Sequence, residues 1–531
     1  VDWDDPLAND FLLVSQFTVV GPLYTCRPDL IGFVNGIPFV VIELKKPGVP
    51  AKQGFDGNLT SYKHPQNGIL PLFWYNTLMI ASNGMDSRVG SITAEWEDYG
   101  EWKRVEREDE PQLVSLEKMI RGTCAKARLM DLAENFTMFS EQTSGLKKIL
   151  ARNHQYLGIN NAMGALERVR GKQGQLGVFW HTQGSGKSFS MVLFAQKVLR
   201  KVSGDWTFVI ITDRTELDDQ IYRTFKACGA TSDHCQAESS AHLRQLLGDN
   251  HRYVFTLIHK FRTENDEPHP VLSNRSDIIV LTDEAHRSQY DTLALNMRSA
   301  LPNALFLAFT GTPLIAGEEE RTKEVFGDYV SVYDFQQSVQ DGATVPLYYE
   351  NRTPELRLKN PNLNDEIYDL IDDAELNPAQ EERLEQELGR QYHIITRDER
   401  LETVAKDIVR HFLGRGFIGK AMMVSIDKAT ALRMHDKVLK YWALDLKRTQ
   451  KELDEITGSG EKYDPEKRRV LEDRLKLLKE TDMALVVSPG QNEIEQMRAL
   501  GLDITPHRKR MNDESLDEKF KDPKDPLRLV F

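Results

Sequence analysis

One stretch of the 531-residue chain decides its fold: Trp180-His181-Thr182-Gln183-Gly184-Ser185-Gly186-Lys187-Ser188. An apolar run at residues 176–180 precedes it and reads as a strand, and residues 189–199 have the spacing of a helix. A glycine-rich turn between a strand and a helix is typical of phosphate-binding loops, because backbone N–H groups at the start of the helix surround phosphate oxygens. The strict pattern begins with glycine where this chain has His181, but the glycines nearest the phosphates are present.

The residues of this loop have separate roles in the predicted ATP site. Gly184 and Gly186 let the backbone turn inward around the phosphates. Lys187 reaches the β- and γ-phosphates, and the Ser188 hydroxyl binds Mg²⁺. We predict that ATP is bound by Thr182, Gln183, Gly184, Ser185, Gly186, Lys187 and Ser188. The alternative is a strand–helix turn that binds no nucleotide.

Two further strand ends carry groups that suit the same nucleotide. The apolar run at 278–281 ends in Thr282-Asp283-Glu284-Ala285-His286, and open α/β sheets bind ligands at the carboxyl ends of their strands. We predict that Asp283 holds Mg²⁺ and that Glu284 orients or deprotonates the attacking water. The run at 305–309 leads into Thr310-Gly311-Thr312-Pro313, whose hydroxyls can sense the γ-phosphate. Two adjacent acids alone usually form a solvated turn, and the phosphate loop favours the catalytic interpretation here.

These three elements resemble the motor core of superfamily 2 helicases and translocases, and residues 283–286 spell its DEAH box. The resemblance implies that Gln155 reads adenine, while His286, Thr310 and Thr312 have accessory roles. It also implies that the segment at 212–217 contacts the DNA backbone through Arg214 and Thr215. Arg214 and Lys260 are candidates for local positive grooves that bind DNA. The alternative for that segment is a helix N-cap followed by a solvated first turn.

A second pattern lies near the N-terminus, where Pro28-Asp29 is followed by a hairpin signal at Asn35-Gly36 and then by Glu43-Leu44-Lys45. The period of two in a strand puts Glu43 and Lys45 on one face. Charges on so apolar a strand are costly to bury unless they are paired or bind a metal. We predict that Asp29 and Glu43 hold Mg²⁺, which activates water beside Lys45.

This second pattern resembles the PD-(D/E)XK nuclease core, in which Asn58 and Tyr62 would be accessory polar residues. The alternative is an ion pair on an edge strand.

The chain is expected to be α/β throughout. We predict a PD-(D/E)XK nuclease-like domain at 1–140, a first RecA-like helicase lobe at 141–345, and a partial second RecA-like lobe at 346–531 with charged and helical insertions. Strand and helix runs alternate from 150 to 345, which indicates a parallel sheet. Residues 112–139 are predicted to be mainly helical, and residues 447–480 to be a charged helical pair.

Composition sets weaker limits. The net charge of −13 excludes a polycationic coat for DNA but leaves room for a local positive groove. The four cysteines read as free thiols, and no apolar run is long enough to span a bilayer.

Three stretches taken together, residues 27–38, 41–48 and 211–220, are similar to the restriction (R) subunit of type I restriction–modification enzymes. The resemblance implies ATP-driven translocation of double-stranded DNA and Mg²⁺-dependent cleavage of unmodified DNA remote from the recognition site. It implies methylase (M) and specificity (S) subunits as partners, in a prokaryotic cytoplasm. The second lobe is expected to be truncated at Phe531, before its arginine finger.

Two other functions stay open for this sequence. One is a DNA repair helicase–nuclease that works without methylase partners. The other is a nucleotide-gated assembly protein without turnover, against which the presence of Lys187, Asp283 and Glu43 speaks.

Overall fold

The computed structural model describes residues 1–142, 145–169, 174–231, 235–249, 251–261, 269–283, 290–312, 318–350, 395–458, 465–490 and 492–531. These residues form two compact units, Val1–Leu347 and Tyr348–Phe531. The four cysteines are free thiols, as expected. Within the described ranges, no helix combines the length and the apolar character that crossing a bilayer requires.

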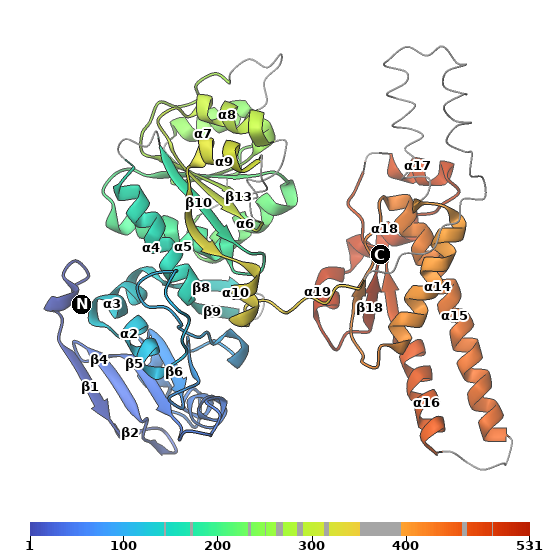
Figure 1. Ribbon diagram of the computed structural model, residues 1–531, viewed down its shortest axis with the longest axis horizontal. Coiled ribbons are helices and arrows are strands. Elements are labelled where there is room, and N and C mark those ends of the chain that lie inside the picture. Colours follow the sequence, from blue (N-terminus) through green and yellow to red (C-terminus); the bar gives the residue numbers. More distant parts are fainter. Residues whose placement is uncertain are drawn as a thin grey trace. The chain divides into compact units, whose positions relative to one another are not determined.

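The first unit begins with a five-stranded mixed sheet, coloured blue in Figure 1. Its strands lie in the order β1-β4-β5-β6-β7, and β5 and β6 are its parallel pair. The predicted hairpin joins β4 to β5 at Asn35 and Gly36, which have φ values of 49° and 78°. The strands are β1 (Phe11–Ser15), β4 (Leu30–Val34), β5 (Ile37–Leu44), β6 (Leu78–Ser82) and β7 (Ser87–Gly90), with a small hairpin of β2 (Val19–Val20) and β3 (Thr25–Cys26).

A short helical segment packs on this sheet and faces β5. It consists of a π-helical turn, Gly54–Leu59, that continues directly into α1, Thr60–Tyr62. Phe55, Leu59 and Tyr62 are buried in the core that Val41 and Met79 share on this side of the sheet. The segment therefore holds residues 54–62 against the carboxyl end of β5.

Two helices and a hairpin connect this sheet to the next one. α2 (Leu116–Thr123) and α3 (Lys126–Asn135) occupy much of the stretch predicted to be helical. The predicted helix is wrong at residues 137–139, because Thr137–Gln142 forms β8 and pairs with β9, Gly145–Leu150. Met138 and Ser140 are buried while Phe139 is exposed, which is the alternation of a strand.

Six parallel strands form the second sheet of the first unit, in the order β12-β11-β13-β14-β10-β15. Five of them were predicted, and β15, which lies at the edge beside β10, was not. The predicted α/β class with a parallel sheet is thereby confirmed. The strands are β10 (Gln175–His181), β11 (Thr207–Thr212), β12 (Tyr253–Leu257), β13 (Ile278–Asp283), β14 (Leu305–Thr310) and β15 (Tyr329–Tyr333).

Helices cover both faces of this sheet, which explains why its strands are almost continuously apolar. Phe179 and Phe208 point to the face covered by α4, α5 and α6, and Val178 and Val209 point to the face covered by α7, α8 and α9. The helices are α4 (Asn153–Glu167), α5 (Lys187–Lys201), α6 (Thr215–Ala227), α7 (Ser240–Gly248), α8 (Tyr290–Ala300), α9 (Glu318–Phe326) and, after β15, α10 (Phe335–Gln340).

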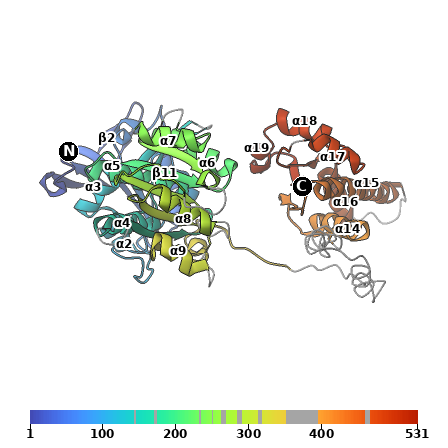
Figure 2. The same cartoon turned by 90° about the horizontal axis from the view of Figure 1, so that it is seen from above.

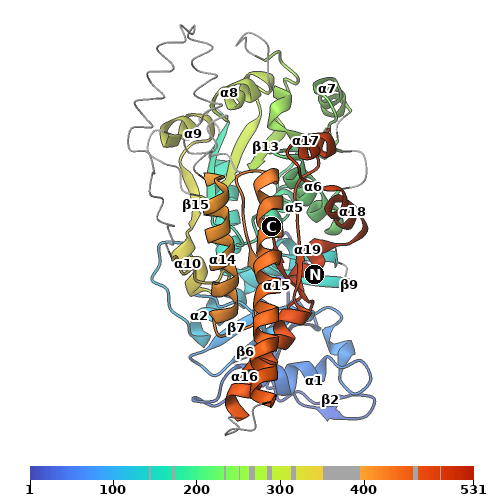
Figure 3. The ribbon, with the colours of Figure 1, turned by 90° about the vertical axis from the view of Figure 1, so that its right-hand side faces the viewer.

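The second unit has a three-stranded parallel sheet in the order β16-β18-β17. α14, α15 and α16 pack together beside it (Figures 2 and 3). The two helices α15 and α16 confirm the predicted charged helical pair. The strands are β16 (Ala421–Met422), β17 (Asp482–Ala484) and β18 (Leu527–Val530), and the helices are α14 (Asp398–Gly414), α15 (Lys428–Gly458), α16 (Pro465–Glu480), α17 (Glu493–Ala499), α18 (Thr505–Asp513) and α19 (Leu516–Lys521).

Candidate functional site

The predicted phosphate loop connects the carboxyl end of β10 to the first residue of α5, as its sequence indicated. Gly184 and Gly186 have φ values of 81° and 86°, which is the left-handed region that favours glycine. Ser185 closes the turn, because its N–H and its hydroxyl both donate to the Thr182 carbonyl, at 3.2 and 2.6 Å. The loop therefore has the backbone form of a cradle for an anion at the start of a helix.

Neighbouring strand ends come to the same edge of the sheet. Thr310 pairs in register with Trp180 at the end of β10. A Cβ atom on Gly311 would lie 3.0 Å from Lys187 Nζ and 2.9 Å from Gln183 Cγ, so glycine is what lets the loop after β14 approach the lysine. The Thr310 hydroxyl donates to the Thr312 carbonyl at 3.0 Å, which ties this loop to itself.

Asp283 is the last residue of β13 and is 8% exposed. It pairs in register with Phe309 of β14, so it lies one strand away from the Thr310 loop. Ser188 is half-buried in the first turn of α5. The other two residues predicted in the DEAH box, Glu284 and His286, lie outside the described residues.

Gln155 lies against the phosphate loop from the first turn of α4. Its Oε1 accepts the Arg152 N–H at 3.0 Å, and its Nε2 donates to the Gly186 carbonyl at 3.1 Å. A cavity of about 330 Å³ opens beside these residues. It is lined by the loop itself, by the β8–β9 hairpin and by the edge of the first sheet, including Gln155, Gly184, Gly186, Phe189, Lys148 and Trp102.

The residues predicted to contact DNA lie at two places. Arg214 and Thr215 are exposed at the start of α6, and Arg214 Nε lies 3.6 Å from Asp213 Oδ2. Lys260 donates to the backbone carbonyl of Ala237, and burial lowers the pKa of its ammonium group. Arg214 is thus the more accessible of the two cations.

The five residues of the predicted nuclease site meet at the carboxyl end of β5. Asp29 Oδ2 accepts the Leu44 N–H at 2.8 Å, which holds this carboxylate beside the strand that carries Glu43 and Lys45. Lys45 Nζ donates to Asn58 Oδ1, and Asn58 Nδ2 donates to Glu43 Oε2, both at 3.0 Å. Asn58 Nδ2 also lies 3.4 Å from the Tyr62 hydroxyl. The π-helical turn and α1 therefore complete the polar cluster that the strand begins.

Glu43 is a buried carboxyl group whose ionised form a bound cation would stabilise. It is 1% exposed, and its Oε1 is buried without a hydrogen-bond partner among the residues that the structure describes. Burial raises the pKa of its carboxyl group to about 7, and the charge of Asp29 adds to the rise, against the opposing effects of Tyr62 and Lys45. The neighbouring carboxylates of Asp29 and Glu43, with the buried Glu43 Oε1 between protein atoms that do not donate to it, suit a hard divalent cation such as Mg²⁺.

Gln16 is a site residue that sequence reasoning missed. Its Nε2 donates to Asp29 Oδ1 at 2.9 Å, and its backbone N–H donates to the Asp29 carbonyl at the same distance. Gln16 has a φ of 54°, a conformation that side-chain-bearing residues rarely adopt. No local pattern singles it out, because it lies 13 residues from its partner in the chain.

Comparison with known proteins matches two parts of the chain to protein families. Residues 1–98 match the family described as type I restriction enzyme R protein N terminus, and residues 154–382 match the SWI2/SNF2 ATPase family. The chain is 36% identical over 471 residues to the type I restriction enzyme HindI endonuclease subunit of Haemophilus influenzae, covering 83% of this chain and 43% of that protein. The chain is a relative of the type I restriction enzyme R proteins.

A more distant relative is also named as a type I restriction enzyme endonuclease subunit. The type I restriction enzyme SsaAORF53P endonuclease subunit of Staphylococcus saprophyticus is 26% identical over 350 residues, covering 63% of this chain and 35% of that protein. The chain spans less than half the length of both relatives. The family predicted from the sequence is confirmed.

Solved structures give weaker likenesses. The UvsW helicase from bacteriophage T4 is 15% identical, with a TM-score of 0.28, and the match covers 39% of this chain and 67% of that one. The ATP-dependent type ISP restriction-modification enzyme LlaBIII bound to DNA is 14% identical, with a TM-score of 0.27. That match covers 38% of this chain and 16% of the LlaBIII chain. The fold class follows from the six parallel strands themselves.

The state of Glu43 predicts how stability depends on pH and on Mg²⁺. Its folded pKa of about 7 lies above the ordinary 4.5, so the folded protein keeps a proton that the unfolded chain has released. The free energy of unfolding should therefore fall by roughly 3 kcal/mol as the pH rises from below 4.5 to above 7. Mg²⁺ should restore stability at pH 8 and have less effect at pH 5.

Chemical denaturation at both pH values, with and without Mg²⁺, measures this. Glu43→Gln should abolish both dependences, while Glu97→Gln, at an exposed carboxylate in the same domain, should behave as the wild type does. Equal stabilisation of the wild type and Glu43→Gln by Mg²⁺ would exclude Glu43 as a ligand.

Proposed function

We propose that the chain is the motor and nuclease part of a type I restriction endonuclease. ATP hydrolysis at the phosphate loop drives translocation along double-stranded DNA, and the Asp29–Glu43–Lys45 site cuts that DNA when it is unmodified. The observation that carries the proposal is the presence of both clusters in one compact unit. The nuclease cluster has a buried carboxylate that suits a cation, and the phosphate loop has left-handed glycines that suit an anion. The R-protein relatives support it.

The motor residues act mainly by positioning and by electrostatics, as in other phosphoryl transfers. The backbone N–H groups of the loop and Lys187 hold the β- and γ-phosphates, and the cavity beside Gln155 receives the nucleoside. Ser188 and Asp283 would hold Mg²⁺, which neutralises phosphate charge when bound. Glu284 orients the attacking water. Thr310 and Thr312 flank Gly311, which lies against Lys187, and would respond to loss of the γ-phosphate.

The nuclease residues divide the work of phosphodiester hydrolysis. Asp29 and Glu43 would hold Mg²⁺, which when bound lowers the pKa of water and stabilises the leaving oxygen. Asn58 fixes the position of Lys45 through its Oδ1, so the ammonium group is held beside the two carboxylates. Lys45 then orients the attacking water or offsets charge on the scissile phosphate. Arg214 and Thr215 would contact the DNA backbone in the motor.

Lys187→Ala should lower ATP hydrolysis by about two orders of magnitude or more, because a cation aimed at the transferred phosphoryl group is lost. Translocation should stop with it. The measurement is DNA-dependent phosphate release by the intact protein, with Lys201→Ala, at the opposite end of the same helix, as a control. Substantial ATPase activity in Lys187→Ala would overturn the assignment of the loop.

Asp29→Ala and Lys45→Ala should each reduce DNA cleavage by at least about a hundredfold while ATP hydrolysis continues, because they remove a metal ligand and a positioned cation. Lys46→Ala changes the neighbouring exposed lysine and should cut DNA normally. If a folded Lys45→Ala variant lost both activities, the two sites would not be separate.

The partners belong to the same proposal, because the relatives are named as subunits of larger enzymes. We propose that methylase and specificity subunits hold the protein at its recognition site, in the cytoplasm where its DNA lies. Cleavage of unmodified DNA by the intact protein should therefore require both added subunits, and methylation of the recognition site should protect the DNA. Efficient cutting without them would favour a repair nuclease instead.

A further inference from the structure

A buried chain of hydrogen bonds links the phosphate loop to the loop at residues 101–111, which lies between the first sheet and α2. Ser331 of β15 is at its centre. His181 Nε2 lies 2.7 Å from Ser331 Oγ, and Ser331 Oγ donates to Glu108 Oε1 at 2.5 Å. Glu108 Oε2 accepts the Val332 N–H at 3.1 Å. His181 and Ser331 are 0% and 1% exposed, so water does not reach the bond between them, and Glu108 is half-buried.

The hydroxyl hydrogen of Ser331 determines which groups donate and which accept along this chain of hydrogen bonds. Ser331 donates that hydrogen to the Glu108 carboxylate, so it can only accept from His181, whose Nε2 must then carry the hydrogen. Burial lowers the pKa of the His181 imidazole well below its usual range, and the charges of His154 and Lys187 act in the same direction. The ring is therefore neutral and has one donor, which it gives to Ser331.

His181 is also the residue that departs from the strict phosphate-loop pattern. It is the last residue of β10, directly before Thr182, whose N–H donates to the Tyr333 carbonyl at 3.0 Å. A glycine at position 181 would have no side chain to reach Ser331. The departure from the pattern thus supplies the group that connects this loop to Glu108.

A second path runs from the same 101–111 loop to the phosphate loop. Lys103 Nζ donates to Asp341 Oδ1 at 2.6 Å, and the Tyr333 hydroxyl donates to Asp341 Oδ2 at 2.9 Å. The Tyr333 ring stacks on His154, with centroids 3.8 Å apart and planes within 8°. His154 Nε2 lies 3.0 Å from the Ser185 carbonyl inside the phosphate loop. Both paths therefore end on residues 181–185.

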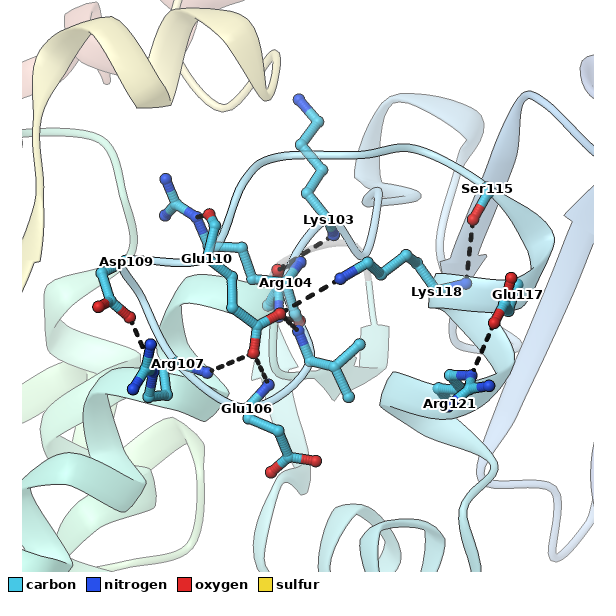
Figure 4. Close-up of polar contacts among 12 residues, drawn as sticks. Lys103, Arg104, Glu106, Arg107, Asp109, Glu110, Ser115, Glu117, Lys118 and Arg121 are labelled. Atoms are coloured by element: carbon cyan, nitrogen blue, oxygen red, sulfur yellow. Dashed lines mark hydrogen bonds and ion pairs between the residues drawn. The ribbon is translucent and has the colours of Figure 1, made fainter.

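The 101–111 loop is held in one shape by the carboxylate of Glu110, which lies within it. Figure 4 shows backbone N–H groups of the loop converging on Glu110. The N–H groups of Val105, Glu106 and Arg107 donate to it at 3.1, 2.8 and 3.1 Å, and Lys118 of α2 adds an ion pair at 3.3 Å. These bonds lower the pKa of the Glu110 carboxyl group to about 2.

The same loop is also fastened to α4 of the motor. Asn153 Oδ1 accepts the N–H groups of Lys103 and Arg104, and Asn153 Nδ2 donates to the Arg104 carbonyl at 2.9 Å. A movement of the loop would therefore shift the positions of α4 and β15 together.

We propose that Glu108 is a positioning residue for ATP, which acts on the phosphate loop through Ser331 and His181. Docking of the 101–111 loop on β15 and binding of ATP then strengthen each other by the same factor, because linkage between two equilibria is reciprocal. The inference rests on the proposed function, since it takes the phosphate loop to be an ATP site. It adds to that site a residue from outside the six-stranded sheet, on the segment that leads from the nuclease-like domain.

The test compares Glu108→Ala with Asp109→Ala in the intact protein. Asp109 is the adjacent acid, and among the described residues it pairs with the exposed Arg107. Glu108→Ala should raise the KM for ATP about tenfold, equivalent to about 1.4 kcal/mol, while kcat stays within about twofold. Asp109→Ala should leave both constants unchanged. If Glu108 served only overall stability, its substitution would lower the unfolding midpoint without raising the KM while kcat stays constant.

The reciprocal effect is measured by amide hydrogen exchange. A non-hydrolysable ATP analogue with Mg²⁺ should slow exchange in residues 101–111 and at Val332 of the wild type, and should not do so in Ser331→Ala. If Glu108→Ala fails to fold, the KM for ATP of Ser331→Ala decides by the same criterion.

Three outcomes are distinct. A KM for ATP within twofold of the wild type in folded Glu108→Ala or Ser331→Ala overturns the inference, provided that Lys187→Ala abolishes ATP hydrolysis in the same assay. Equal losses in Glu108→Ala and Asp109→Ala also overturn it, because the effect would then be one of charge alone. Absence of ATP hydrolysis in the wild type would instead refute the proposed function.

Discussion

The position of β10 between β14 and β15 is the constraint on which the first unit depends. β14 brings the Thr310 loop beside the phosphate loop, and the missing side chain of Gly311 leaves room for Lys187. β15 lies on the other side and carries Ser331 and Tyr333, which contact the residues that open the phosphate loop. A change in the register of β10 would separate the loop from both neighbours, because parallel strands deliver their ends to one edge only when they are aligned.

The two predicted sites attract cations and anions by different physical means. The phosphate loop offers backbone N–H groups and a lysine, so it favours negative charge and needs left-handed glycines to bend. The nuclease site instead buries Glu43 next to Asp29, which disfavours the ionised form and raises the pKa of Glu43 to about 7. In the proposed function, Mg²⁺ bound there would offset the charge of both carboxylates, so the unfavourable burial of Glu43 would favour binding of the ion. Asn58 holds Lys45 and Glu43 at once and keeps the cluster in register.

Local patterns predicted much of this arrangement because they are read over a few residues. The strand–loop–helix at 176–199, the hairpin at Asn35-Gly36 and the grouping of Asp29 with Glu43 and Lys45 all depend on short-range periodicity and turn chemistry. The same reasoning extended a helix to residue 139, where Thr137–Gln142 forms a strand with Gly145–Leu150. It also missed β15, a half-buried edge strand of only five residues, although its valines and tyrosines are residue types that strands favour. Both errors concern segments whose structure is decided by the partner strand.

By itself, the sequence determined which residue types stand at which spacing: a glycine-rich loop before a helix, a carboxylate at a strand end and a D…ExK pattern. These patterns predict the chemistry, because residue type and spacing carry the mechanism. Only the tertiary structure decided which distant groups support that chemistry. Gln16 reaches Asp29 across a hairpin, Asn58 joins Glu43 to Lys45 from a separate helix, and Glu108 reaches His181 through a strand that lies more than two hundred residues further along the chain. Such contacts depend on how sheets and loops pack, and packing brings together residues whose separation in sequence leaves no periodic trace.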